Sequence, residues 1–194
     1  MRECKIKRKT LETEISIKLN LDGTGNKKIN TGIKFLDHML DQLASHGYFD
    51  LEIDVKSLDK DSHHIVEDTA LTLGSAFKKA LGDKKGINRY GYTIIPMDEA
   101  LTLCSIDLSG RPFSNFDAEI PEERVSDLET LLVKHFFSSF STGSMSTLHI
   151  SLLFGEDTHH IIESMFKAFA RALRTACSIN PEHPETVPST KGSI

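Results

Sequence analysis

Two copies of one short motif carry the residue types best suited to bind a metal ion. Each copy reads Asp, a small hydroxyl residue, His, His, two apolar residues and Glu. The copies contain His63, His64 and Glu67, and His159, His160 and Glu163. One such motif is weak evidence, because a histidine on a helix is usually structural. Its repetition after 96 residues, with Glu at the same offset, indicates a metal site.

Helix geometry predicts how these side chains are shared between ions. Residues i and i+4 share a face, so His63 and Glu67 are neighbours. Adjacent histidines point about 100° apart, so one ion is not expected to take both His63 and His64. Two ions, each drawing on both copies, would use all of them. A further pair, His38 and His135, lies 97 residues apart near the first helix of each half. Nitrogen and carboxylate ligands without thiolate suit Mn²⁺, Fe²⁺, Co²⁺ or Zn²⁺.

Cationic and hydroxyl residues form a second group, which fits a phosphate. Arg89 precedes a predicted strand, Arg111 follows one, and Ser189, Thr190 and Lys191 lie near the end of the sequence. Guanidinium and ammonium groups, hydroxyls and backbone N–H groups are the donors that a phosphate accepts from. Taken singly, each residue also fits a solvated surface charge, and terminal residues are often disordered.

Composition excludes several classes of protein. The 194 residues are 39% hydrophobic and 26% charged, which is ordinary for a soluble globular domain. No apolar run approaches the roughly 18 residues of a membrane helix, and the basic start lacks the apolar core of a signal peptide. Three widely spaced cysteines favour a reducing, cytoplasmic location. The net charge of −5 disfavours nucleic acid as a partner, so an anionic substrate needs local cations.

The periodicity of the first half predicts the elements that position these residues. Alternation over Thr13–Leu21 predicts a strand of a hairpin, followed by a turn over residues 22–25. A helix is predicted over Ile33–Ser45, and a strand over Leu51–Val55. A second helix is predicted from an N-cap at Asp61 to about Leu81, before Gly82.

The second half repeats this order. Paired strands are predicted over Tyr92–Ile95 and Leu101–Leu108, a helix over Val125–Ser139 and a strand over Leu148–Leu152. A last helix is predicted from the Asp157-Thr158 cap to about Ser178. The pattern is a ββαβα unit in tandem, which indicates an α+β fold. We expect repeats over residues 1–85 and 86–180 and a substrate-binding tail over 181–194, all within one integrated domain.

Five segments together resemble the imidazoleglycerol-phosphate dehydratase family over nearly the whole chain. They are FLDHMLDQLASHGYFDLEI, HHIVEDTALTLGSAF, PMDEALTLCSIDLSGRPF, HHIIESMFKAFARALR and PSTKG. The resemblance implies a fold of the ribosomal protein S5 domain 2 type, with helices packed between two sheets. It implies a lyase of histidine biosynthesis that converts D-erythro-imidazoleglycerol phosphate to imidazoleacetol phosphate. It also implies two Mn²⁺ per subunit at subunit contacts, in a twenty-four-subunit homo-oligomer built from trimers.

The same resemblance implies roles for individual residues. The implied metal ligands are His38, His63, His64, Glu67, His135, His159, His160 and Glu163. The implied substrate contacts are Glu12, His38, Gln42, His46, His63, Glu67, Arg89, Arg111, Ser189, Thr190 and Lys191. Glu12 and Glu163 are the candidates for proton transfer. From the residues alone, His46 also fits a helix C-terminal cap.

Two other functions fit the same clusters. A dinuclear metallohydrolase would share the His and Glu ligands, but such enzymes usually bridge their ions with aspartates. A metal-storing shell protein would leave Arg89, Arg111 and Lys191 without a role. Two segments depart from the family pattern: Ser57–His64, just before and into the first motif, and the serine-rich Ser138–Thr147, which we expect to be a loop.

Overall fold

The fold is taken from a computed structural model, and the structure describes residues 2–192 and 194. Its elements in chain order are β1 (Glu3–Lys9), β2 (Thr13–Asn20), β3 (Lys27–Asn30), α1 (Lys34–Gly47), β4 (Asp50–Ser57), α2 (Ser62–Leu81), β5 (Tyr90–Met97), β6 (Ala100–Asp107), β7 (Phe113–Asp117), β8 (Arg124–Val125), β9 (Leu128–Glu129), α3 (Leu131–Ser144), β10 (Thr147–Phe154) and α4 (Thr158–Cys177). Among the described residues, no helix combines the length and hydropathy that crossing a membrane requires.

The two halves form sheets of the same topology. The first sheet has the order β1-β2-β4-β3 and the second has the order β5-β6-β10-β7. In each sheet the first two pairings of this order are antiparallel, and the edge strand β3 or β7 runs parallel to its neighbour. The predicted tandem duplication and α+β class are therefore confirmed.

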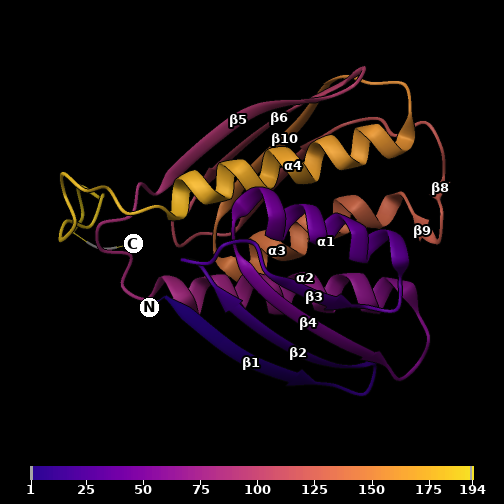
Figure 1. Cartoon of the computed structure of the whole chain (residues 1–194), viewed down its shortest axis with the longest axis horizontal. Coiled ribbons are helices and arrows are strands. Elements are labelled where there is room, and N and C mark those ends of the chain that lie inside the picture. The colour runs from indigo at the N-terminus through magenta and orange to yellow at the C-terminus, as the bar shows by residue number, and fades with distance from the viewer. Residues whose placement is uncertain (1, 193) are drawn as a thin grey trace.

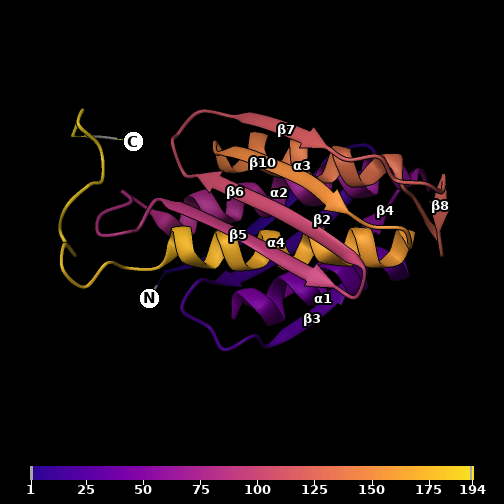
Figure 2. The ribbon, with the colours of Figure 1, turned by 90° about the horizontal axis from the view of Figure 1, so that it is seen from above.

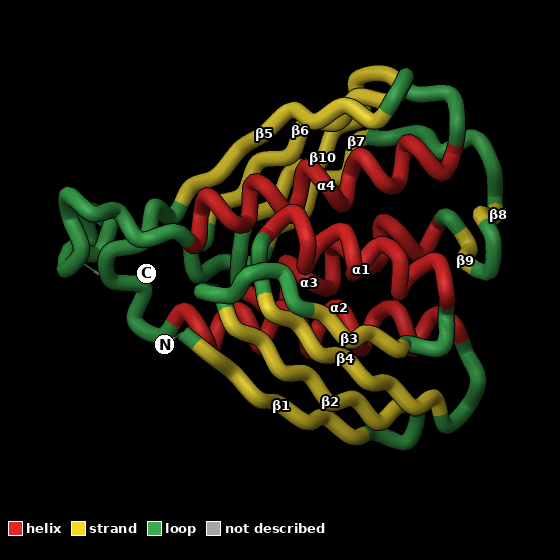
Figure 3. Tube along the Cα trace, in the orientation of Figure 1, coloured by secondary structure: helices red, strands yellow, loops and turns green. Residues whose placement is uncertain are grey.

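The four long helices lie in a double layer between the two sheets (Figures 1 and 3). Helix α4 packs on β5 and β6, and α2 packs on β1 and β2. Helix α1 then packs on α4, and α3 packs on α2, so each inner pair joins one helix from each half. The core fills the space between these layers with buried phenylalanine, leucine and isoleucine side chains.

The four-stranded sheet of each half contains one strand more than the ββαβα prediction. Strand β3 is short, mostly exposed and rich in lysine, and β7 alternates only between exposed and half-buried residues. Both are edge strands, as Figure 2 shows for β7. Edge strands commonly carry polar and charged side chains, so their hydrophobic periodicity is weak. The sequence pattern alone therefore missed them.

The predicted third helix was wrong at both ends. Residues from Val125 to Glu129 form part of a small hairpin, β8 and β9, so α3 begins at Leu131. At the other end, most of the serine-rich stretch expected to be a loop is helical, up to Ser144. Hydroxyl groups there bond back to the backbone: Thr142 Oγ1 donates to the carbonyl of Ser138 at 3.0 Å. Ser144 Oγ donates to the carbonyl of Ser141 at 3.3 Å, and Ser141 Oγ donates to the carbonyls of Ser146 and Phe113 outside the helix, so these hydroxyls find partners without ending α3.

Small residues allow α2 and α3 to approach closely. A Cβ added to Gly143 of α3 would lie 2.2 Å from the carbonyl oxygen of Leu71. A Cβ added to Gly74 of α2 would lie 2.4 Å from the carbonyl oxygen of Phe140. The two backbones are therefore in direct contact, and this contact fixes the spacing of the histidines that the two helices carry.

The motif helices begin where the sequence predicted. Asp61 accepts from the backbone N–H of His63 at 2.8 Å, and Asp157 accepts from that of His160 at 3.0 Å. Each aspartate satisfies an N–H group that would otherwise lack a partner in the first turn. Both motifs therefore start in the first turn of their helices, and their side chains project from one end of the helix layer.

Candidate active site

Helices α1 and α4 bring together one complete group of metal-binding side chains. Glu163 Oε2 lies 3.0 Å from Nε2 of His159 and 3.3 Å from Nε2 of His38. These three residues can place one ligand atom each within 4.8 Å of one another. We call them the α1–α4 set. His38 comes from the first half and the other two residues from the second half, so the set combines residues of both halves.

The second oxygen of Glu163 is held by a lysine. Glu163 is 8% exposed in its side chain, and Oε1 lies 2.7 Å from Lys167 Nζ. Burial raises the pKa of this carboxyl, but Lys167, His159 and His38 outweigh burial, so its pKa lies below the ordinary value. Glu163 is therefore an ionised carboxylate that presents a single oxygen to the two histidines.

Helices α2 and α3 carry the corresponding residues His63, Glu67 and His135, which we call the α2–α3 set, although these three do not place one ligand atom each within 4.8 Å of one another as the α1–α4 set does. His63 Nε2 lies 3.0 Å from Glu67 Oε2, and the ring of His135 packs edge-on at 4.8 Å from the ring of His63. The set again combines two residues of one half with one residue of the other. Here the carboxylate is 42% exposed, and Leu71 stands one turn beyond it, where α4 has Lys167. The two sets are thus related by the duplication but differ in their surroundings.

His64 and His160 lie outside both sets. His64 Nδ1 lies 2.6 Å from Asp59 Oδ2, and His160 Nδ1 lies 2.7 Å from Glu99 Oε2. The neighbouring carboxylate raises the pKa of each histidine, with the hydrogen bond as the main cause. We call this pair the outer histidines. The prediction that one ion does not take both histidines of a motif agrees with this geometry.

Glu12 lies beside the first outer histidine. It sits in the β1–β2 turn with a side chain 47% exposed, and its Oε1 is 3.6 Å from His64 Nε2. Glu12, Asp59 and His64 can also place ligand atoms within 4.8 Å of one another. The candidate acid–base residue and a candidate metal ligand therefore meet on one exposed edge, although 52 residues of sequence separate them.

A polar stripe extends from the α1–α4 set along the two helices. Gln42 and His46 follow His38 at intervals of four residues, and His46 Nε2 lies 3.0 Å from Gln42 Oε1. Burial, and then the charges of Lys167 and Arg171, lower the pKa of His46. The sequence analysis missed Lys167 and Arg171. Their spacing of four and eight residues beyond Glu163 was a usable signal, because such residues share a helix face.

The predicted phosphate-binding residues line one concave region of about 660 Å³. Its lining includes Arg89, Arg111, Ser189, Thr190 and Lys191. We call this region the tail pocket. Arg89 donates from Nε to Asp107 at 2.7 Å and from Nη1 to the carbonyl of Pro188 at 2.7 Å. This arginine therefore ties the tail to the second sheet as well as facing the pocket.

The tail pocket and the α1–α4 set lie at opposite ends of α4. The backbone N–H of Arg89 donates to the carbonyl of Ala176 at 3.0 Å, whereas His159 is in the first turn of the helix. Seventeen residues of α-helix separate these positions by about 25 Å. Figure 1 shows the tail beyond one end of α4 and the connection from β10 at the other end. A ligand much shorter than this distance cannot touch both within one chain.

The donor groups fit a hard or borderline divalent metal. Each set offers two imidazole nitrogens and one carboxylate oxygen, which are ligands that Mn²⁺, Fe²⁺ or Zn²⁺ accepts. Three donors leave positions open on a six-coordinate ion, so a substrate, water or an outer histidine of another chain can complete each set. Bound metal would supply Lewis-acid chemistry at these positions.

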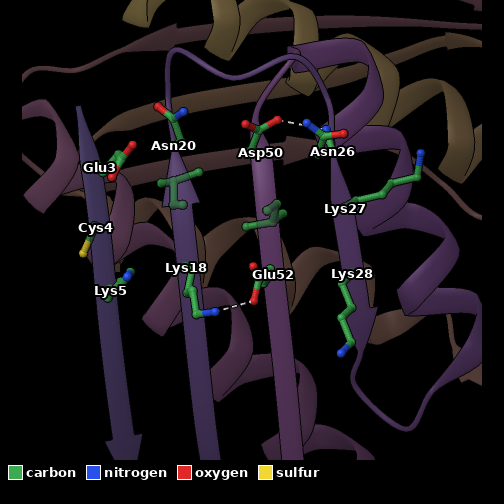
Figure 4. A pocket seen from close by; sticks show the side chains of 12 residues that line it. Glu3, Cys4, Lys5, Lys18, Asn20, Asn26, Lys27, Lys28, Asp50 and Glu52 are labelled. Carbon is green, nitrogen blue, oxygen red and sulfur yellow. Dashed lines mark hydrogen bonds and ion pairs between the residues drawn. The ribbon is translucent and has the colours of Figure 1, made fainter. Parts of the chain in front are cut away.

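A separate hollow of about 570 Å³ lies on the solvent face of the first sheet (Figure 4). Lysine side chains and carboxylates alternate there, and Lys18 Nζ lies 2.7 Å from Glu52 Oε2. Its lining contains no histidine and no residue of the tail pocket. The hollow is therefore a charged, solvated sheet surface, unrelated to the metal-binding sets.

Comparison with known proteins decides the family. Residues 31–173 match the family model described as imidazoleglycerol-phosphate dehydratase. The chain belongs to the imidazoleglycerol-phosphate dehydratase family. Imidazoleglycerol-phosphate dehydratase 1, chloroplastic, of Arabidopsis thaliana is 54% identical over 97% of this chain and 70% of its own length. The dehydratase of Lachnoclostridium phytofermentans is 53% identical over 100% of this chain and 98% of its own.

Solved structures of the family share the fold. The dehydratase of Staphylococcus aureus superimposes with a TM-score of 0.83 at 36% identity, covering 92% of this chain and 99% of its own. The Pyrococcus furiosus enzyme, solved in complex with (S)-C348, gives a TM-score of 0.85 at 34% identity, over 97% and 100% of the two chains. The predictions of family, fold class and enzymatic nature are confirmed. The family consists of dehydratases of histidine biosynthesis, so the metallohydrolase and storage-shell alternatives are set aside.

Proposed function

We propose that the chain dehydrates D-erythro-imidazoleglycerol phosphate to imidazoleacetol phosphate, with two Mn²⁺ per subunit. The observation that carries this proposal is the pairing of two similar His-His-Glu sets with a distant pocket of anion-binding groups. The sets suit an imidazole-binding metal, and the tail pocket suits a phosphate. Each of the eight candidate ligands lies in one of the two sets or is an outer histidine.

The substrate needs help from the metal because its reacting C–H bond is barely acidic. The carbon bears only a hydroxyl, and no carbonyl is present to stabilise a carbanion. The two sets would hold the metal, which would supply Lewis-acid chemistry by lowering the pKa of the substrate imidazole, so that an imidazolate could assist loss of the adjacent hydroxyl as water once that hydroxyl has accepted a proton. The neighbouring C–H then becomes acidic, and a carboxylate can remove its proton to form the enol of the product.

Glu12 fits this proton transfer better than Glu163. Both oxygens of Glu163 are occupied, one by Lys167 and the other by His38 and His159. Glu12 is half exposed and lies just beyond hydrogen-bond distance of His64. We assign Glu163 as a ligand and Glu12 as the acid–base group, while Arg111, Ser189, Thr190 and Lys191 hold the phosphate.

We further propose that each active site is shared between chains. The separation of about 25 Å along α4 requires that the metal-binding set and the tail pocket of one site come from different copies. The outer histidines project beyond their own sets and suit donation to a neighbour. This arrangement favours the large homo-oligomer implied by the family resemblance, a twenty-four-subunit assembly of trimers.

The test combines activity with assembly. The chain should convert imidazoleglycerol phosphate with Mn²⁺ and lose that activity after chelation. Because ligands from two copies would hold each ion, chelation should also shift the particle to a smaller mass, measured by light scattering. Readdition of Mn²⁺ should restore both the activity and the original particle mass. An active enzyme without metal would refute the metal role, and an unchanged particle after complete metal removal would refute shared ligands.

A further inference from the structure

The two outer histidines are held through the same ring nitrogen by carboxylates from different places in the fold. His64 Nδ1 faces Asp59, which lies in the connection between β4 and α2. His160 Nδ1 faces Glu99, which lies in the turn between β5 and β6. In both cases the distance is that of a charge-assisted hydrogen bond. The opposite ring nitrogen, Nε2, faces carboxylates only at longer distances, Glu12 at 3.6 Å from His64 and Asp98 at 3.7 Å from His160, so it can still turn to another ligand.

These carboxylates are not equivalent positions of the duplication. Glu99 directly precedes β6, the second strand of its half, and its counterpart directly before β2 is Glu12. Duplication alone would therefore have paired Glu12 with His64 Nδ1. Instead Asp59 takes that place, within the Ser57–His64 segment that departs from the family pattern. Asp59 and Glu99 stand at non-equivalent positions, yet each contacts the Nδ1 atom of its histidine. Duplication of one ancestral unit therefore does not explain these two contacts.

Each carboxylate is oriented by the backbone through its other oxygen. Asp59 Oδ1 accepts from the N–H of Asp61 at 3.0 Å, while Oδ2 faces His64. Glu99 Oε1 accepts from the N–H of Asp157 at 2.8 Å and of Glu156 at 3.2 Å, while Oε2 faces His160. The oxygen that meets each histidine can only accept, so Nδ1 must carry a hydrogen, and in the neutral ring Nε2 then carries the lone pair.

We infer that Asp59 and Glu99 are positioning residues that fix the tautomer and orientation of the outer histidines for metal binding through Nε2. A metal-bound histidine commonly donates its other N–H to a carboxylate, which orients the ring and raises its basicity. The inference rests on the proposed metal role of His64 and His160. It also explains why Glu12 is available for chemistry: Asp59 occupies the contact that would otherwise engage this hairpin glutamate.

The sharpest test replaces each carboxylate by its amide, as Asp59→Asn and Glu99→Gln. The backbone N–H groups will keep the amide oxygen, so the amide NH₂ must turn toward the histidine. That NH₂ can only donate, which forces the lone pair onto Nδ1 and the hydrogen onto Nε2. In ¹⁵N-histidine-labelled full-length protein, NMR should therefore show His64 in the reversed tautomer in Asp59→Asn and His160 in Glu99→Gln, each variant serving as the other's control.

Metal binding supplies the second readout. Titration of the metal-free chain with Mn²⁺, followed by electron paramagnetic resonance, should show binding about 10–100-fold weaker in both variants. Asp54→Asn is the matched control, because this exposed β4 carboxylate contacts Asn30 on the solvent face of the sheet. It should bind Mn²⁺ like the wild type.

Several outcomes would overturn the inference. One is an unchanged tautomer in folded variants, and another is a reversed tautomer with Mn²⁺ affinity equal to that of the wild type. If Glu99→Gln does not fold, Asp59→Asn, on an exposed connection, still decides the question. Failure of the proposed function would look different: the wild-type chain itself would not bind Mn²⁺ or would not convert the substrate, while the tautomers would still respond to the amide substitutions.

Discussion

Glu12 and Glu99 occupy corresponding places in the two halves, but their surroundings give them different chemistry. Glu99 accepts from Asp157 and Glu156 backbone N–H groups and meets His160, and these bonds, led by that from Asp157, lower its pKa to about 2. Such a carboxylate stays ionised and fixed at neutral pH. Glu12 is half exposed and meets His64 at 3.6 Å. The surroundings of Glu99 therefore suit a fixed carboxylate, whereas those of Glu12 suit the proton transfer proposed for it.

Glu12→Gln tests this difference at the residue scale. The amide cannot take a proton, so kcat should fall by roughly 10²–10⁴, the usual contribution of a positioned acid or base. Manganese content, particle mass and KM should stay close to wild type, because Glu12 is assigned to the chemical step. The control is Glu14→Gln, which changes an exposed β2 glutamate paired with Lys9. Turnover of Glu12→Gln at the control's rate would exclude Glu12 as the acid–base group.

At the scale of elements, close packing of α2 on α3 determines the geometry of the α2–α3 set. His63 and His135 lie on different helices, and their rings are 4.8 Å apart. Gly74 and Gly143 permit this spacing because their Cα atoms lie against backbone atoms of the facing helix. Glycine lowers the intrinsic stability of a helix by about 1 kcal/mol relative to alanine. The backbone contact offsets this cost and sets the distance between the histidines.

Gly143→Ala should therefore lower stability even though alanine favours helices. The new Cβ would meet the carbonyl oxygen of Leu71, which cannot rotate away, and overpacking of this kind costs about 1–3 kcal/mol or more. Each kcal/mol of net loss should lower the melting temperature by roughly 2–4 °C. Weaker Mn²⁺ binding should accompany this loss of stability, because α2 and α3 move apart. Ser138→Ala, on the exposed face of α3, is the control and should melt like the wild type.

At the scale of the whole molecule, the helix layer places two kinds of binding group at opposite ends. The connections into α2 and α4 lie at one end, and the C-terminal tail, whose residues line the tail pocket, lies at the other (Figure 1). A single chain therefore carries both kinds of binding group, but they are too far apart to contact one small substrate together. Association of copies is what would join a metal-binding set to a tail pocket.

Mixing two inactive variants tests this arrangement. Glu12→Gln removes the proposed acid–base group at the end of the chain that carries the motifs. Arg111→Ala removes a cation of the tail pocket. Mixed assemblies formed by chelation and readdition of Mn²⁺ should contain some sites with an intact metal end from one chain and an intact pocket from another. Activity of the mixture should rise well above that of either variant alone. If the activity of the mixture is only the average of the activities of the two variants, each site belongs to one chain.

Several features of this protein can be predicted from the sequence alone, because they depend on local physical chemistry. Helical periodicity places His63 beside Glu67, capping aspartates mark the start of α2 and α4, and the repeat of the motif predicts the duplicated α+β fold. These features depend on residues within a few positions of one another. The edge strands β3 and β7, and the helical end of α3, escaped prediction because their character comes from neighbours far along the chain.

Tertiary structure alone decided how these parts combine. Packing of α1 on α4 and of α3 on α2 pairs His38 with His159 and His135 with His63, and sequence spacing carries no information on which helices meet. The same is true of Asp59, which reaches His64 through a turned connection in place of the hairpin glutamate. The distance of about 25 Å between the metal-binding set and the tail pocket follows from the length of α4 and from which segment packs at each of its ends. Such contacts depend on the shape of the whole core, because it determines which distant segments come within reach of one another.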